Sequence, residues 1–294
     1  MVANVTDSNM DYGTERIALA MGNRPLLVYT IHPDDFAIGA AGTTYKASQR
    51  GKVYVVNIVP PRLYGGYEHT REEVNYDRIK DEFDISCKIL GCEGIFDLEE
   101  SEWLPKDYKP GTLGDPDPND EVLEKIIVHS IRDIRPGAIL LPLESDHHKD
   151  HLNGSKAIQY TTWRAGRPSR VSELGEPWHF PNQLHEILEY SVIPILMHQP
   201  GLLYVNITGE PSDKKLEAML AHQSQMSRDP LYWFQARLRD IENAITLHGT
   251  AKLNTLFPEQ VLNVEEAKAA SLNYFGTVNV PMAEVFKPSG FASR

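Results

Sequence analysis

The sequence predicts an α/β fold, a three-layer Rossmann-like arrangement with a mainly parallel sheet and helices on both faces. Strand-like runs alternate with helical stretches along the 294 residues, which is the pattern of parallel βαβ units. The runs at residues 26–31 and 138–142 are continuously apolar, as expected of strands buried on both faces. Each of these two runs is followed directly by a cluster of His and Asp. Ligand sites of open α/β sheets lie at that end of the strands.

The first βαβ unit occupies residues 26–59. A strand at 26–31 is followed by a helix from about Phe36 to Gln49, and Gly51 marks the end of that helix. A second strand covers residues 53–59 and is terminated by a Pro-Pro pair, because proline cannot continue the hydrogen-bonded ladder.

The next two helices are recognised by their apolar spacing. Residues 79–90 carry apolar side chains at helical intervals and end at Gly91, which predicts a helix followed by a short strand at 94–98. Asp120 is placed to cap a helix whose apolar residues run from Val122 to Ile134.

The second half of the chain continues the alternation. A strand at 138–142 precedes a helix at 151–163, strands follow at 185–192 and 202–207, and helices follow at 212–225 and 231–247. Residues 1–24 are interpreted as a loosely attached N-terminal segment with one short helix, and residues 25–294 as a single domain. Three long stretches, 62–76, 99–119 and 164–184, are predicted to lie over the functional end of the sheet.

Composition narrows the function classes. Acidic residues outnumber basic ones, 41 to 29, and the net charge is −12, which disfavours nucleic acid and anionic membrane surfaces as partners. No apolar run is long enough to span a bilayer and no signal peptide is evident, so a cytoplasmic location is expected. The only two cysteines, Cys87 and Cys92, are interpreted as buried thiols rather than as a disulfide framework.

The cluster after the first strand is His32-Pro33-Asp34-Asp35. Pro33 stiffens the turn and favours an extended His32. Either aspartate could serve only as a helix cap. A cap explains neither the histidine nor the second cluster downstream.

The second cluster is residues 146–151, Asp-His-His-Lys-Asp-His. Two such clusters at the ends of parallel strands can meet at one rim of the sheet. Imidazole nitrogen and carboxylate oxygen are ordinary ligands of zinc and similar divalent ions, and a catalytic site needs about three of them plus an open position. His147 and His151 have the i,i+4 spacing of a helical zinc pair, so the spacing alone leaves both as candidates.

These motifs resemble those of the PIG-L/LmbE-like metal-dependent N-acetylglucosaminyl deacetylases. The turn at 32–35 and the His-x-Asp-His at 148–151 carry the resemblance. Weaker matches at 90–91, 134–136, 222–225 and 282–286 extend it over most of the chain.

The resemblance implies a set of roles. His32, Asp35 and His151 would bind the metal, which is Zn²⁺ or alternatively Fe²⁺ or another divalent ion. Asp34 would be the general base, His148 would be a cation facing the oxyanion, and Asp150 would hold and polarise a histidine. The contributions of His147 and His222 stay open.

The implied activity is hydrolysis of an N-acyl group, in the first instance N-acetyl, from a small-molecule amino sugar or its conjugate. Aromatic residues of the long loops, Tyr64, Tyr67 and Trp103, are candidates for stacking on the sugar, although loop aromatics often only pack the loop. The alternatives are an amidase acting on a larger sugar or thiol conjugate and a non-catalytic sugar-binding paralogue. The sugar, its aglycone and any homo-oligomer are left open by the sequence.

Overall fold

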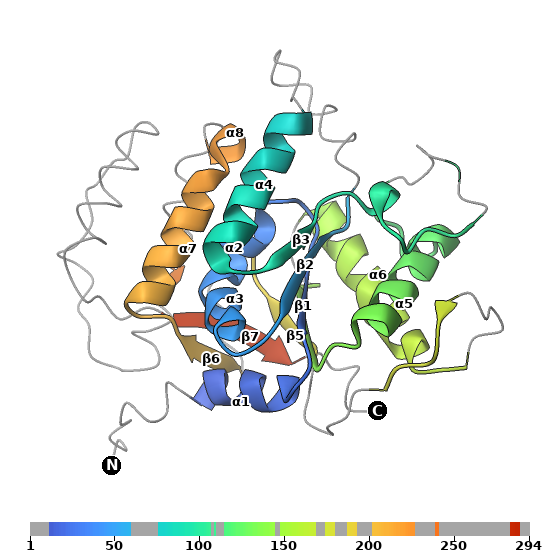
Figure 1. Ribbon diagram of the computed structural model, residues 1–294, viewed down its shortest axis with the longest axis horizontal. Coiled ribbons are helices and arrows are strands. Elements are labelled where there is room, and N and C mark those ends of the chain that lie inside the picture. Colours follow the sequence, from blue (N-terminus) through green and yellow to red (C-terminus); the bar gives the residue numbers. More distant parts are fainter. Residues whose placement is uncertain are drawn as a thin grey trace.

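A seven-stranded sheet forms the centre of the described part of the chain (Figure 1). The computed structural model describes residues 12–59, 76–106, 109, 115–144, 148–168, 174–179, 187–192, 202–226, 239–240 and 283–288. The strands are β1 (Leu26–Thr30), β2 (Val53–Asn57), β3 (Glu93–Ile95), β4 (Ala138–Pro142), β5 (Ile187–Tyr190), β6 (Leu203–Asn206) and β7 (Ala283–Pro288). Their order is β3-β2-β1-β4-β5-β7-β6. Only β7 runs antiparallel to its neighbours among the described strands, so the predicted mainly parallel sheet is confirmed.

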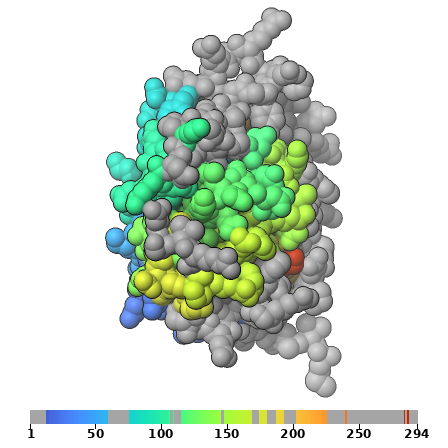
Figure 2. Space-filling view, turned by 90° about the vertical axis from the view of Figure 1, so that its right-hand side faces the viewer, coloured from blue at the N-terminus to red at the C-terminus, as the bar shows by residue number. Residues whose placement is uncertain are grey.

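Helices cover both faces of the sheet, as predicted (Figure 1). They are α1 (Tyr12–Met21), α2 (Asp35–Gly39), α3 (Ala41–Ser48), α4 (Tyr76–Leu90), α5 (Glu121–Ile134), α6 (Lys149–Ala165), α7 (Glu210–Ala221) and α8 (Gln223–Met226), with a short 3₁₀ helix at Leu98–Glu100. Helices α2, α3, α4 and α7 pack together on one face, and α5 packs against α6 on the other. Figure 2 shows the surface that α5 and α6 form. None of the described helices is long and apolar enough to cross a membrane.

The direction in which strands are added reverses between β1 and β4. From β1 the chain adds β2 and then β3 on one side, and α5 then carries it back to β4 on the other side of β1. Such a reversal places the carboxyl ends of two adjacent strands beside a crevice that their connecting helices leave open. Both His/Asp clusters of the sequence follow these two strands.

The core matches the apolar runs of the sequence. Every residue of β1 and of β4 is buried, because helices lie on both sides of these strands. The hydroxyl of Tyr29 is hydrogen-bonded to Ser130 of α5 at 2.7 Å, and the hydroxyl of Tyr190 donates to the Tyr29 carbonyl at 2.8 Å. The polar ends of these buried aromatic rings therefore have partners.

The helix predicted at 36–49 is in fact two helices. The chain breaks at Ala40, whose φ of −142° is not helical. Gly39 lies so close to the Tyr190 ring that a Cβ would come within 2.3 Å of it, and a Cβ on Gly42 would come within 2.6 Å of Ile207. The two glycines let α2 and α3 approach the sheet closely on either side of the break.

The N-terminal segment and the last strand differ from the predictions. The expected short helix is α1, but Ile17, Ala20 and Met21 are buried in the core, so this part of the segment is packed rather than loosely attached. The sequence analysis identified the region of β7 only as a weak motif at 282–286 and did not predict a strand there. In the structure β7 lies between β5 and β6. The helix predicted at 231–247 lies almost wholly outside the described residues.

A buried ionic cluster ties β7 to the helices. Lys215 of α7 contacts Glu284 of β7 at 2.9 Å and Asp240 at 2.8 Å, and all three side chains are fully buried. Glu284 also accepts the backbone N–H groups of Gly42 (3.0 Å) and Thr43 (2.8 Å) at the start of α3. The weak motif near the end of the chain is therefore a structural one.

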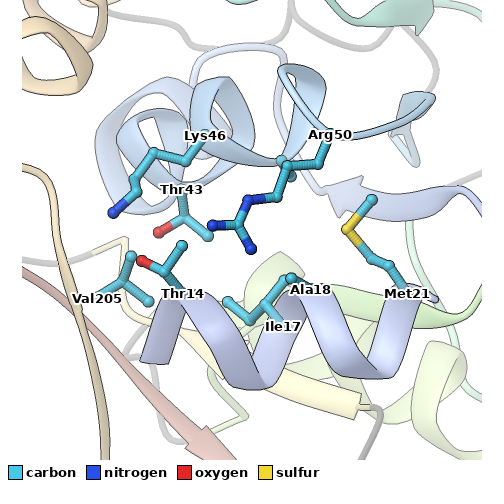
Figure 3. Close-up of a pocket in the computed structure, with 9 residues that line it drawn as sticks. Thr14, Ile17, Ala18, Met21, Thr43, Lys46, Arg50 and Val205 are labelled. Atoms are coloured by element: carbon cyan, nitrogen blue, oxygen red, sulfur yellow. The ribbon is translucent and has the colours of Figure 1, made fainter. Parts of the chain in front are cut away.

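A small pocket lies between α1 and α3 (Figure 3). Its lining is mostly apolar, with Lys46 and Arg50 beside it. Its volume of about 10 Å³ is room for no more than one water molecule. This pocket is too small for a sugar.

Candidate metal centre

The turn after β1 is built so that His32 and Asp35 face each other. The Thr30 hydroxyl donates to the His32 carbonyl at 2.5 Å and accepts the Phe36 N–H at 3.2 Å. The Asp35 carboxylate in turn accepts the His32 N–H at 2.7 Å. The sequence analysis did not identify Thr30 as a residue that orders this turn. The feature that could have indicated it is a single hydroxyl near the end of an otherwise apolar strand.

The second cluster begins helix α6, two residues earlier than predicted. His148 is its N-cap, and Nδ1 of His148 accepts the Asp150 N–H at 3.3 Å. Ser155 anchors the helix to the end of β4 by donating to the Pro142 carbonyl at 2.7 Å. His151, in the first turn, is thereby buried beneath the turn of His32, with only 4% of its surface exposed.

Three potential ligand atoms converge at this rim. Nδ1 of His32 lies 3.1 Å from Nε2 of His151, and Oδ2 of Asp35 lies 3.1 Å from the same Nε2 and 3.5 Å from Nδ1 of His32. Ligands bound at ~2.0–2.2 Å to a tetrahedral zinc ion are separated by about 3.3–3.6 Å. The 3.5 Å side of this triangle lies within that range and the two 3.1 Å sides are slightly shorter, so a small outward movement of Nε2 of His151 would fit the three atoms to one face of a zinc coordination tetrahedron.

A second donor set is His32, His148 and His151, which can each offer one ring nitrogen so that the three atoms lie within 4.8 Å of one another. This grouping is looser, and Nδ1 of His148 is engaged in capping α6. We favour the set with Asp35 because its pairwise separations are closer to those of the coordination tetrahedron. A carboxylate also supplies negative charge to a divalent cation.

Asp35 and the two histidines of the cluster shift one another's pKa values. Burial alone would raise the pKa of Asp35, but the neighbouring His151 and His32 outweigh it and hold this pKa well below its usual range. Burial likewise would lower the pKa of His32, yet the charge of Asp35 and hydrogen bonds to Asp150 and Asp35 raise it to about 9. In the metal-free protein Asp35 is thus anionic and His32 is cationic, so a bound cation would take the place of the His32 proton.

Asp34 is next to this triangle in the chain, and its carboxylate does not cap helix α2. It occupies the N-cap position of α2, yet its side chain makes no capping hydrogen bond within the described part of the chain. Burial and the charge of Asp35 raise the pKa of Asp34 to about 6, with His32 opposing the shift. A carboxylate with a pKa near 6 can take up and release a proton close to neutral pH.

His148 and Asp150 flank the triangle on the α6 side. Asp150 contacts Nε2 of His32 at 3.2 Å, so the histidine that it holds is His32. Burial and the neighbouring His32 and His151 lower the pKa of His148. The cationic His148 expected from the resemblance is therefore not supported; a neutral ring that accepts at Nδ1 carries its proton on Nε2 and can donate from there.

Of the three aromatic residues proposed for substrate binding, the structure describes Trp103. Tyr64, Tyr67 and the alternative ligand His147 lie outside the described residues. Trp103 is only 6% exposed, and its indole N–H donates to Asp133 near the end of α5 at 3.1 Å. Helix α5 returns the chain to the amino-terminal edge of the sheet, so Trp103 is held at the opposite end from His32 and its proposed stacking role is not supported.

The described part of the loop after α6 that contains Trp178 is also at the opposite end. Trp178 donates to the Pro136 carbonyl at 3.0 Å and lies beneath Arg24, residues that precede β4 and β1. The prediction that residues 164–184 cover the functional end is therefore wrong for this part of the loop. A helix that follows a parallel strand brings the chain back to the other edge of the sheet.

His222, left open in the sequence, is fully buried behind the site. Its ring packs edge-on against Phe36 at 6.3 Å between centroids. Burial lowers its pKa to about 3, so the ring is neutral. Glu82 of α4 accepts the Ser224 N–H at 2.8 Å, which fixes the junction of α7 and α8 next to His222.

The fold and site together describe an α/β protein with a candidate metal centre of two histidines and one aspartate at its topological switch point. Residues 27–161 match the family described as PIG-L: GlcNAc-PI de-N-acetylase. Over these residues the chain is similar to the PIG-L/LmbE-like proteins, and the matched region contains every residue of the candidate metal centre.

Known proteins support the same class. The chain is 28% identical to a diacetylchitobiose deacetylase of Thermococcus kodakarensis over 221 residues, covering 71% of this chain and 73% of the relative. Its fold is similar to that of the N,N′-diacetylchitobiose deacetylase from Pyrococcus horikoshii (TM-score 0.55, 18% identity, 99% and 94% of the two chains). It is also similar to a 4-carboxy-2-hydroxymuconate hydratase from Pseudomonas putida KT2440 (TM-score 0.56, 17% identity, 90% and 95%). The fold alone therefore does not define the reaction.

Proposed function

We propose that this protein is a metal-dependent hydrolase that removes an N-acyl group, in the first instance N-acetyl, from an amino sugar or its conjugate. The main observation behind this proposal is the triangle of His32, Asp35 and His151, whose potential ligand atoms are separated by 3.1–3.5 Å. Beside it lies Asp34, whose carboxylate does not cap the helix. The relative named as a diacetylchitobiose deacetylase supports an acetamido sugar as the small-molecule substrate.

The metal would be held by His32, Asp35 and His151. Two nitrogens and one oxygen suit Zn²⁺, and Fe²⁺ is the alternative. When bound, the ion supplies Lewis acidity, which lowers the pKa of a ligated water and polarises a carbonyl. Asp150 keeps the His32 ring in place through Nε2 at 3.2 Å, as partners of metal-binding histidines commonly do.

The remaining residues handle the proton and the developing charge. Asp34 accepts the proton of the attacking water and delivers it to the nitrogen that leaves as an amine. His148 donates a hydrogen bond to the oxyanion that forms at the amide carbon. The capping bond at its Nδ1 orients the ring so that Nε2 is the donor.

A screen for released acetate tests this function. Wild-type protein loaded with Zn²⁺ or Fe²⁺ is incubated with N-acetylglucosamine, diacetylchitobiose and N-acetylglucosaminides, and acetate and the free amine are measured together. Equimolar acetate and amine, absent with Asp34→Asn at equal metal content, support the proposal. Cleavage only of amides with larger acyl groups would favour the amidase. Tight sugar binding without any turnover would favour a non-catalytic paralogue.

A further inference from the structure

The carboxyl end of α4 brings the two cysteines of the chain together. Gly91 adopts a φ of +68°, and the Cys92 N–H donates to the Cys87 carbonyl at 3.0 Å. This is the 6→1 bond of a Schellman motif, which places the side chains at its two ends in contact. A pair of apolar residues usually fills these positions; here both are thiols.

The two thiols are neighbours in an asymmetric environment. Cys92 donates from Sγ to the Cys87 carbonyl at 3.3 Å, so the Cys92 thiol lies against the residue that carries the other thiol. Cys87 is 3% exposed, whereas Cys92 is half-buried and therefore reachable from solvent. A Cβ on Gly94 would lie 2.9 Å from Sγ of Cys87, so the glycine leaves room for the buried thiol.

We propose that Cys87 and Cys92 form a dithiol modification site that closes to a disulfide by exchange with a small disulfide such as glutathione disulfide. The Cys92 thiolate attacks one sulfur of the small disulfide, forming a mixed disulfide and expelling one small thiolate. Sγ of Cys87, after losing its proton to solvent, then attacks Sγ of Cys92, forming the internal bond and expelling the second. The protein loses two electrons and two protons, and the small disulfide is reduced to two thiols.

Burial favours an internal disulfide over the other products. Burial and the neighbouring Cys92 raise the pKa of the Cys87 thiol, which disfavours a charged bis-thiolate complex with a soft metal ion. A disulfide is uncharged and suits this largely apolar place beside Phe83. A bulky adduct on Cys92 is removed by the Cys87 thiol, because the backbone and the Cys92 thiol both bond to the Cys87 carbonyl and hold the two residues together. This inference does not depend on the proposed hydrolase activity.

Mass spectrometry of the full chain provides the test. Fully reduced protein is equilibrated with glutathione and glutathione disulfide at increasing ratios of disulfide to thiol. The samples are quenched with acid and alkylated, and the mass of the full chain is measured. We expect both thiols to disappear together, with a mass lower by two hydrogen atoms and no retained glutathione. Because the chain has only 2 cysteines, an internal disulfide has one assignment.

Single variants separate the two steps. Cys87→Ala should keep glutathione on Cys92, since the resolving thiol is gone, and Cys92→Ser should keep its buried thiol free. The proposal is overturned if the wild-type protein accumulates a stable glutathione adduct or a disulfide-linked dimer. It is equally overturned if both wild-type thiols survive in glutathione disulfide alone.

Discussion

Nδ1 of His32 lies 3.1 Å from Nε2 of His151, although 119 residues separate them in the sequence. The contact exists because β1 and β4 are neighbours in the sheet and their carboxyl ends meet at the topological switch point. Asp35 contacts both rings. Strand order therefore brings the residues of the candidate metal site together.

Asp34→Asn tests the assignment of the base. The amide keeps the shape of the side chain but cannot accept the proton, so kcat should fall by ~10²–10⁴-fold while metal content stays at the wild-type level. Steady-state kinetics and metal analysis on the same preparation check this. Near wild-type turnover with metal bound would mean that another group takes the proton.

His148→Ala tests the oxyanion donor and also the choice of ligand set. Metal should remain bound, and kcat should fall by ~10²–10³-fold, the usual effect of removing one such donor. Lys149→Ala, an exposed neighbour in the same helical turn, is the control and should change neither quantity. Loss of the metal in the His148 variant would favour the three-histidine set.

Metal binding should release a proton from His32. The pKa of this ring in the metal-free protein is about 9, so the ring is protonated at pH 7–8 and must lose that proton to bind a cation. Affinity should therefore weaken as pH falls below about 9, by up to tenfold per pH unit. Calorimetry in buffers of different ionisation enthalpy counts the proton; a count of zero at pH 7.5 would contradict the raised pKa.

Lys215→Met should destabilise the fold strongly. It removes the ammonium group that contacts two fully buried carboxylates, Asp240 at 2.8 Å and Glu284 at 2.9 Å. Breaking such a buried pair typically costs ~3–5 kcal/mol of unfolding free energy. The adjacent Lys214→Met removes only a partly exposed ion pair with Glu217 and should leave the urea midpoint unchanged. Equal midpoints for the two variants would show that the buried cluster is not stabilising.

Local sequence patterns were sufficient for the elements that carry the site. The apolar runs before His32 and His148 predicted β1 and β4, and Asp120 caps α5 through two backbone N–H groups as expected. Parallel topology then brought the clusters together. These predictions depend only on local periodicity and on the rule that parallel strands end at one rim.

Predictions that needed long-range contacts were less successful. Trp103 and Trp178 look like substrate aromatics on long loops, but their partners Asp133 and Pro136 lie at the other edge of the sheet. Glu284 accepts a hydrogen bond from Gly42, which is 242 residues away in the sequence. No local sequence pattern predicts that contact. Burial of a side chain by distant segments is the information that a single sequence does not contain.

Metal content and acetate release, measured together on one preparation, test the central claim most directly. Protein is assayed as purified, after exhaustive chelation, and after one equivalent of Zn²⁺ or Fe²⁺ is returned, with Asp35→Asn and His151→Ala in parallel. The account predicts about one ion per wild-type chain, no acetate release after chelation, recovery on adding the ion back, and little bound metal in either variant. Undiminished acetate release from the chelated, metal-free protein would contradict it.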